Sequence, residues 1–262
     1  MAFPTPDTIT LVGVTCFCLV LAGVSYYKRI FDLSGSLSAF VVGMVIGICG
    51  SVLWLLLLLV FLVSSFGATR YRFEWKRAKG FQEGKKGERN WRNIAANGAI
   101  PTLIAFASFV SQVVANGNPD AEFFSKDVAS FMFVTAVAVA AADTAASEIG
   151  IVDPRVYLIT TFRRIKRGTD GGISLTGQLV AFVAAAYTSV VAYVLFATLD
   201  TDLLAGPRTL LIPMLSGFLG CQVDSVIGAT WERSGKIGKL GNNFVSIALG
   251  TLIALLFAIG SL

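Results

Sequence analysis

Two apolar stretches that carry carboxylates near one end decide how this chain folds: ADTAASEIG at residues 142–150 and CQVDSVIGATWE at residues 221–232. Each begins in an apolar run long enough to lie in a bilayer, and together they hold Asp143, Glu148 and Asp224. An ionisable side chain at membrane depth costs about 2.5–3.5 kcal/mol on insertion scales. Such residues mark a functional site by default, so we expect a site built from these acids.

Composition sets the class of protein. Of 262 residues, 55% are hydrophobic and only 14% are charged, and the mean hydropathy is +0.74. These values are typical of a polytopic membrane protein and lie outside the range of soluble globular domains. No polar stretch is long enough to bury a core of its own, so residues 1–262 are expected to form a single integral membrane domain.

Hydropathy predicts an all-α transmembrane helical bundle of about eight spans. The expected spans are residues 8–27, 35–49, 51–67, 94–115, 128–148, 174–198, 209–230 and 243–261. The first run lacks a positively charged segment before it and is expected to remain as a span, not to be cleaved as a signal. The second and third spans meet at Gly50 and Ser51, which favours a tight hairpin over one long kinked segment.

Basic residues gather in alternate loops. All 21 lysines and arginines except Lys126 and Arg208 follow the first, third, fifth or seventh span. The positive-inside rule then predicts that these loops are cytoplasmic and that both termini lie outside. Short loops and the lack of a transit peptide favour a prokaryotic cell membrane. Because the cations are dispersed over the loops of a membrane-embedded chain, a nucleic-acid partner is not expected.

The available chemistry is narrow because the chain has no histidine. The commonest general base and the commonest transition-metal ligand are therefore missing. The four cysteines lie in apolar segments without paired spacing, which argues against a zinc site or a disulfide framework. Catalysis would have to use carboxylates, hydroxyls, amides, lysines, arginines or a hard metal ion.

The acids fall at the expected cytoplasmic ends of their spans. On a helix Asp143 and Glu148 lie roughly 140° apart, whereas Asp143 shares a face with Ser147. We therefore expect Asp143 and Asp224, from neighbouring helices, to hold Mg²⁺, a hard cation served by one or two carboxylates, water and substrate phosphates. The alternative is that the acids form interfacial ion pairs, for which the candidate partners are Arg163, Arg164 and Arg167.

A glycine-rich turn precedes the sixth expected span. In RIKRGTDGGISLTG, residues 164–177, free backbone N–H groups and cations next to a helix start suit a phosphate group. The candidate phosphate-binding residues there are Lys166, Arg167, Gly168, Thr169, Gly171, Gly172 and Ser174. A serine-capped structural turn is the alternative. The sequence contains no Walker A motif.

Further polar residues stand near the same ends of other spans. Asn97, Asn242 and Asn243 are expected at the first turns of the fourth and eighth spans, and Ser225 follows Asp224. Either they contact a nucleotide or a phosphate, or the asparagines cap their helices.

The two acidic stretches also resemble each other weakly, which is consistent with a parallel pseudo-repeat.

Several motifs together resemble a known family. They are DLSGSLSAFVVG (32–43), FLVSSFGATRYR (61–72), RNIAANGAIPT (92–102), ADTAASEIG (142–150), GTDGGISLTG (168–177), CQVDSVIGATWE (221–232) and GNNFVS (241–246). Their order and spacing are similar to those of the polytopic family known as domain of unknown function 92, which includes animal transmembrane protein 19 and the plant phytyl phosphate kinase of tocopherol synthesis. The resemblance covers nearly the whole chain.

The resemblance implies an enzyme that uses CTP or another nucleoside triphosphate to convert an isoprenyl monophosphate, such as phytyl or geranylgeranyl phosphate, to the diphosphate. Asp143 and Asp224 would then carry Mg²⁺ on the donor, with Glu148 as a third ligand or an orienting group. The expected partners are the isoprenyl phosphate, the nucleotide and membrane lipids. The glycines of the second and sixth spans also permit a homo-oligomer.

Three other readings of the sequence remain. A cytidylyltransferase acting on a lipid phosphate would release pyrophosphate and form a CDP-lipid. A transporter would use the acids as an ion site, although transporters usually place polar groups near the midplane, at broken helices. A structural membrane protein would use the acids only for ion pairs.

Overall fold

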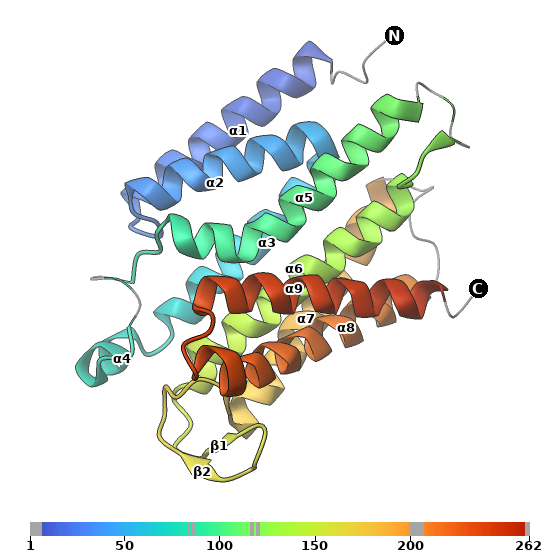
Figure 1. Ribbon diagram of the computed structural model, residues 1–262. Coiled ribbons are helices and arrows are strands. Elements are labelled where there is room, and N and C mark those ends of the chain that lie inside the picture. Colours follow the sequence, from blue (N-terminus) through green and yellow to red (C-terminus); the bar gives the residue numbers. More distant parts are fainter. Residues whose placement is uncertain are drawn as a thin grey trace.

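The computed structural model describes residues 7–82, 84, 87–115, 118, 121–199 and 207–259. The long elements are helices that pack into one bundle (Figure 1). They are α1 (Thr8–Tyr27), α2 (Leu33–Val45), the π-helix η1 (Ile46–Gly50), α3 (Val52–Arg70), α4 (Phe73–Lys79), α5 (Trp91–Ala115), α6 (Lys126–Gly150), α7 (Leu175–Leu199), α8 (Pro207–Ile227), the π-helix η3 (Gly228–Glu232) and α9 (Lys239–Ile259).

Within this described part, eight helical segments are long and apolar enough to cross a membrane. These segments are Thr8–Tyr27, Leu33–Gly50, Val52–Arg70, Trp91–Ala115, Lys126–Gly150, Leu175–Leu199, Pro207–Glu232 and Lys239–Phe257. They coincide with the predicted spans to within a few residues at each end, so the predicted helical bundle is confirmed. Residues 260 and 261 of the last predicted span lie outside the described residues.

The second and third spans form a hairpin. The Ser51 hydroxyl accepts a hydrogen bond from the Trp54 N–H at 3.3 Å and so caps α3 directly after η1. At the other end of the hairpin, both Gly35 of α2 and Thr69 of α3 contact Arg89. The chain therefore reverses at Ser51, and the alternative of one long kinked segment is wrong.

A small antiparallel sheet between α6 and α7 adds to the all-α prediction. It consists of β1 (Val156–Leu158), β2 (Arg164–Ile165) and β3 (Gly172–Ile173) in the order β2-β1-β3. Tyr157 of β1 is aligned with Arg164 on one side and Ile173 on the other. Strands this short carry no periodic hydrophobic signal, which is why hydropathy does not reveal them.

Helix α6 is the centre of the bundle. Of its most apolar window, 78% is buried, compared with 17–39% for the other seven spans. Small side chains let its neighbours approach closely: a Cβ atom at Gly217 of α8 would lie 2.8 Å from the Cβ of Ala138. Gly220 of α8 and Gly250 of α9 both face Val139 in the same way. Near the end of this helix, Glu148 is buried and Asp143 is half-buried.

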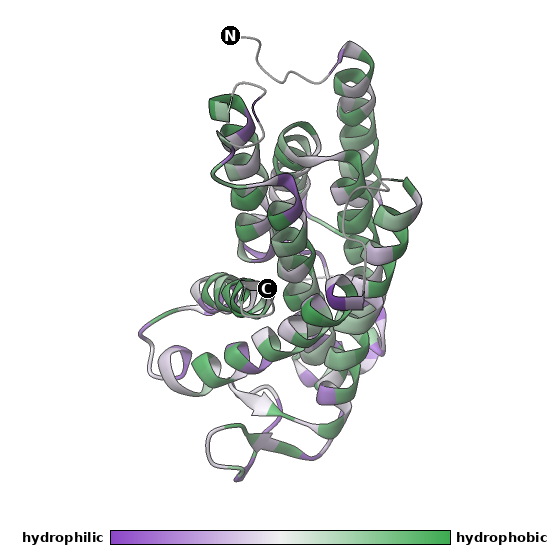
Figure 2. Ribbon diagram, turned by 90° about the vertical axis from the view of Figure 1, so that its right-hand side faces the viewer, coloured by the Kyte–Doolittle hydropathy of each residue, from purple (hydrophilic) through white to green (hydrophobic). Residues whose placement is uncertain are grey.

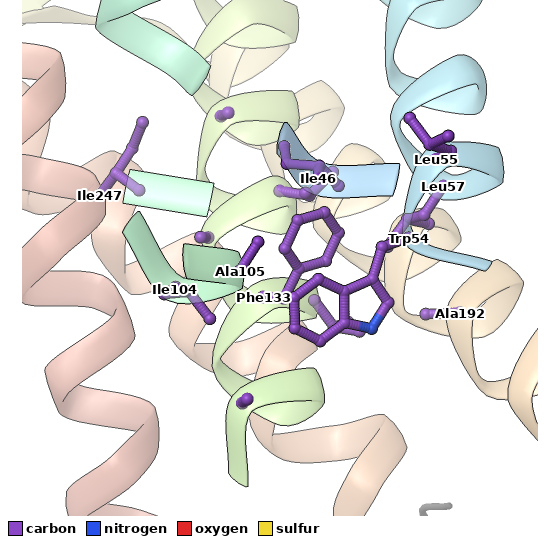
Figure 3. Close-up of a cluster of buried hydrophobic side chains, with 14 of the residues drawn as sticks. Ile46, Trp54, Leu55, Leu57, Ile104, Ala105, Phe133, Ala192 and Ile247 are labelled. Carbon is purple, nitrogen blue, oxygen red and sulfur yellow. The ribbon is translucent and has the colours of Figure 1, made fainter. Parts of the chain in front are cut away.

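The largest apolar cluster joins α3 to the first half of α6 (Figure 3). Trp54 stacks on Phe133 with ring centroids 4.3 Å apart and an interplanar angle of 17°. The Trp54 Nε1–H donates to the hydroxyl of Ser130 at 3.3 Å, which satisfies its one polar atom. This cluster fixes α3 against α6 at a distance from the acidic residues.

The basic loops meet at one end of the bundle. Backbone hydrogen bonds of 3.0 Å join Arg89 to Ile30 and Asp32, which links the loop after α1 to the loop before α5. Arg167, after α6, lies over the ring of Trp75 in α4, with 5.3 Å to the ring centroid. Hydrophobic residues dominate the helices in Figure 2, and hydrophilic ones are commoner at helix ends and in loops. Which side of a membrane this end faces stays a prediction.

Candidate active site

A cleft of about 380 Å³ lies at this basic end, between the last turns of α6, the end of α8 with η3, the start of α9 and the turn before α7. We call it the acidic cleft. Most of the predicted site residues line it: Asp143, Glu148, Gly168, Thr169, Gly171, Gly172, Ser174, Asp224, Ser225, Asn242 and Asn243. Asn97, Lys166 and Arg167 are not part of its lining.

Two carboxylates from different spans meet in the acidic cleft. Asp143 lies on α6 and Asp224 on α8, and their side chains are within hydrogen-bonding reach of each other. Two adjacent carboxylates repel each other unless a proton or a cation lies between them. The pair therefore provides the kind of oxygen ligands that Mg²⁺ prefers.

Amide and hydroxyl groups of α9 hold this pair. The side-chain amide of Asn243 donates to Asp143 Oδ2 at 3.2 Å and lies 3.4 Å from the Oδ1 of Asn97 on α5. The Ser246 hydroxyl donates to Asp224 Oδ1 at 3.0 Å. Because α5 begins at Trp91, Asn97 lies in its second turn and does not cap the helix. Asn243 therefore contacts Asp143 across helices, Asn97 contacts Asn243, and the capping alternative does not describe these two asparagines.

Glu232 also lines this cleft, and the sequence reading missed it. Asn242 donates from its side-chain amide to Glu232 Oε2 at 2.9 Å and to the carbonyl of Asp224 at 3.2 Å. On a regular helix Glu232 would be turned about 80° from Asp224. The wider π-helical turn of η3 reduces that offset and directs Glu232 into the acidic cleft. The Asn242 Oδ1 atom is buried and makes no hydrogen bond with any described residue.

Glu148 belongs to a separate buried ionic cluster. Its Oε2 is 2.6 Å from Lys76 Nζ, and its Oε1 is 3.6 Å from Arg89 Nη2. Thr69 also donates to Oε1 at 3.0 Å. Glu148 therefore faces α3 and α4 while Asp143 faces α9, as their separation on the helix predicts. Ion pairing, the alternative considered for the acids, describes Glu148, but its partners are Lys76 and Arg89 instead of Arg163, Arg164 or Arg167.

The three predicted acids thus do not meet at one point. Among the described residues, no group of three or more histidine, cysteine, aspartate or glutamate side chains is close enough together to hold a metal ion. With Glu148 bound to Lys76, its role as a third metal ligand is not supported by the geometry, and the orienting role is the one that remains. The Asp143–Asp224 pair is the set of ligands available to a divalent ion.

The glycine-rich turn packs on the end of α8. Gly168 and Gly171 both have φ of +74°, and Gly171 contacts the backbone of Ala229 in η3. The Ser174 hydroxyl accepts from the Gly177 N–H at 3.1 Å and donates to the Gly150 carbonyl at 3.3 Å. Ser174 therefore caps α7 and ties it to α6, while the glycines face the acidic cleft.

The cations predicted beside this turn point elsewhere. Lys166 is exposed, and Arg167 donates from Nε to the carbonyl of Asp153 at 3.0 Å. Asp153 in turn accepts from the Arg155 N–H at 2.9 Å and from the Thr176 hydroxyl at 2.8 Å. The hydrogen bond from Arg155 is the main reason that the pKa of Asp153 lies below its ordinary value. A basic residue that does line the acidic cleft is Lys239 of α9.

A second cleft of about 470 Å³ adjoins the first. We call it the arginine cleft, because it contains Arg89 and Arg92. It shares five residues with the acidic cleft: Asp143, Ser147, Glu148, Lys239 and Asn243. Asp143 therefore stands in a wall common to two polar clefts.

The fold and these clefts define a polytopic integral membrane protein with acids and amides clustered where its helices meet. The model of the integral membrane protein family DUF92 matches residues 16–253, and the chain belongs to that family. This finding confirms the resemblance seen in the motifs.

Individual relatives come from archaea and plants. An uncharacterized membrane protein of Methanocaldococcus jannaschii is 28% identical over 259 residues, which cover 98% of each chain. Protein PGR of Arabidopsis thaliana is 31% identical over 246 residues, or 88% of this chain and 82% of PGR. Protein VTE6, chloroplastic, of the same plant is 28% identical over 227 residues, or 85% of this chain and 64% of VTE6. No solved structure matches the chain significantly.

Proposed function

We propose that the protein transfers a phosphoryl group from CTP or another nucleoside triphosphate to an isoprenyl monophosphate, such as phytyl or geranylgeranyl phosphate, with Mg²⁺ as cofactor. The observation that carries the proposal is the position of Asp143. It pairs with Asp224 and lies in the wall between two polar clefts, so two phosphorylated substrates can approach it from different sides.

The donor set suits Mg²⁺. Asp143 and Asp224 would hold the ion, and the buried Asn242 Oδ1, which has no partner among the described residues, adds an oxygen beside them. Bound there, the ion would neutralise charge on the donor phosphates during phosphoryl transfer. Asn243 and Ser246 orient the two carboxylates through their hydrogen bonds.

The acidic cleft would take the nucleotide. Gly168 to Gly172 present backbone next to the start of α7, and Lys239 of α9, which also lines the cleft, adds positive charge. These groups suit the phosphates of a nucleoside triphosphate. The same role was predicted for Lys166 and Arg167, but neither residue lines the cleft. They would contribute only positive charge near its entrance.

The arginine cleft would take the acceptor. An oxygen of the acceptor phosphate attacks the γ-phosphorus of the donor, the bond from that phosphorus to the β,γ-bridging oxygen breaks, and the nucleoside diphosphate leaves. A phosphate monoester has a second pKa near 6 and is already anionic at neutral pH, so it needs little help from a general base. The lack of histidine in the chain is therefore compatible with this reaction.

Membership of the family supports the choice of substrate, since the motif resemblance implies an isoprenyl phosphate kinase. The similarity to Protein VTE6, at 28% identity, is distant and supports the same choice without fixing the reaction. The prediction of a cytoplasmic site rests on the basic loops at this end of the bundle.

Purified protein in lipid nanodiscs should convert CTP and geranylgeranyl phosphate to CDP and geranylgeranyl diphosphate only when Mg²⁺ is present. Asp143→Asn and Asp224→Asn should each abolish turnover, whereas Asp127→Asn, an exposed acid at the other end of α6, should not. Pyrophosphate and a CDP-lipid as products would establish the cytidylyltransferase instead. Full turnover in both acid variants would refute the proposed site.

A further inference from the structure

A third cavity, apolar and separate from the acidic cleft, runs between α1, α2, α3 and α5. It has a volume of about 120 Å³, and we call it the apolar groove. Most of its wall is hydrocarbon, including Leu21, Phe40, Leu58 and Leu62. At one end the wall becomes polar, and the polar residues there include Arg89, Asn93 and Asn97. The same three residues line the arginine cleft, so the groove and that cleft share an end.

We propose that the apolar groove binds the hydrocarbon tail of the acceptor lipid and places its terminal phosphate at Arg89, Asn93 and Asn97. This inference rests on the proposed function, because it states where the acceptor of that reaction lies. The ligand would be an amphiphile with one phosphate monoester at the end of an apolar chain.

The shared end connects the groove to the acid pair. Asn97 lies 3.4 Å from the amide of Asn243, which donates to Asp143 at 3.2 Å. Arg89 is held in place by the hydroxyls of Ser65 at 3.2 Å and Thr69 at 3.1 Å. A phosphate at this end would therefore meet a fixed guanidinium and lie two amide side chains away from Asp143.

The length of the groove and its place at the edge of the bundle suit a lipid chain. Along α3 its wall extends from Leu55 to Ser65, which is about 15 Å of helix. The most apolar windows of α1 and α2 are only 17% and 28% buried, so these helices stand at the edge of the bundle. A lipid could thus enter sideways from the bilayer, without passing through the polar clefts.

Small residues keep the groove open. Ala22 of α1 and Ala39 of α2 both line it and are only half-buried, so a larger side chain at either position would fill the groove without entering the core. Ala197, which is exposed near the end of α7 and is not among the residues that line the three cavities, offers the same substitution as a control.

The binding test uses geranylgeranyl monophosphate that carries a diazirine on its tail, with the full-length protein in nanodiscs and no nucleotide. Mass spectrometry should find the label on α1, α2 or α3 at residues of the groove. Excess unlabelled geranylgeranyl monophosphate should compete with the label, and excess phosphatidylcholine should not. Ala22→Phe and Ala39→Phe should each reduce labelling, whereas Ala197→Phe should leave it unchanged.

The kinetic test separates this inference from the proposed function. In both groove variants the KM for geranylgeranyl phosphate should rise by about 4- to 15-fold, the effect of displacing one or two methylenes, while transfer to dimethylallyl phosphate should be unchanged. If unlabelled geranylgeranyl monophosphate competes with the label in the groove but no turnover is measured, the proposed kinase activity is refuted and the proposed lipid site stands. If the protein turns over but the label falls outside the groove, the proposed lipid site is refuted and the kinase activity stands. The same conclusion follows if phosphatidylcholine displaces the label as well as geranylgeranyl monophosphate does.

Discussion

The side-chain amide of Asn243 lies 3.2 Å from Asp143 Oδ2, and this contact joins the start of α9 to the central helix. An amide that donates to a metal-binding carboxylate fixes the direction of that carboxylate, and the loss of such partners usually costs about 10–100-fold in metal affinity or activity. Asn243→Ala should therefore raise the Mg²⁺ concentration needed for half-maximal turnover by such a factor.

The matched control is Gln112→Ala, which removes an amide that, among the described residues, bonds within α5 to the Ser108 hydroxyl at 3.3 Å. Its Mg²⁺ dependence should equal that of the wild type. Binding of Mn²⁺, followed by electron paramagnetic resonance without substrates, gives a second readout for Asn243→Ala. An unchanged Mn²⁺ affinity would show that Asn243 does not position Asp143.

Gly171→Ala tests the contact between the glycine-rich turn and η3. Its φ of +74° makes any other residue strained by about 1–2 kcal/mol, and a Cβ atom would also collide with the backbone of Ala229. Gly235 has the same φ, but in the described part of the chain no residue beyond its two chain neighbours comes within 4 Å of the Cβ position. Gly171→Ala should lower both the thermal midpoint and turnover, whereas Gly235→Ala should lower only the midpoint. Equal turnover in the two variants would argue against a role for the turn in binding.

Much of this arrangement can be predicted from the sequence, because spans have a strong hydropathy signal. Helical geometry also predicts that Asp143 and Glu148 face different ways. The partners of Glu148 cannot be predicted so simply, because Lys76 is 72 residues away and lies in a polar segment whose path hydropathy does not describe. Glu232 depends on a π-helical turn that has no clear sequence signal. Lys166 is next to the glycine-rich turn in sequence, yet it points to solvent.

Lys76→Met should strongly destabilise the protein, because it leaves the buried carboxylate of Glu148 without its 2.6 Å partner. Breaking a buried ion pair costs about 3–5 kcal/mol, although Arg89 at 3.6 Å will offset part of this loss. Adding Glu148→Gln should recover stability, since the double variant no longer buries an uncompensated charge.

The neighbouring ion pair of Arg77 and Glu74, 3.9 Å apart and well exposed, provides the control. Arg77→Met should change the free energy of unfolding by less than about 1 kcal/mol. Thermal unfolding in detergent, followed by intrinsic fluorescence, measures all three variants and the wild type. If Lys76→Met were no more destabilising than Arg77→Met, the buried cluster would not contribute to the fold as described.

Asp153 should make stability depend on pH in the acidic range. Its carboxylate holds the Arg155 N–H and Thr176, so its pKa in the folded protein lies below the ordinary value of 3.8. A pKa that is lower in the folded state means that the charged form favours folding. This stabilisation is complete above the unfolded pKa and disappears as the pH falls through the folded pKa. Asp153→Asn should therefore lower the thermal midpoint at pH 7 by more than it does at pH 3, because the stabilisation that depends on the charge is lost as the carboxylate is protonated. Thermal midpoints of both proteins at these two pH values measure the difference. A gap that stays constant with pH would show that the charge of Asp153 has no part in holding the start of α7.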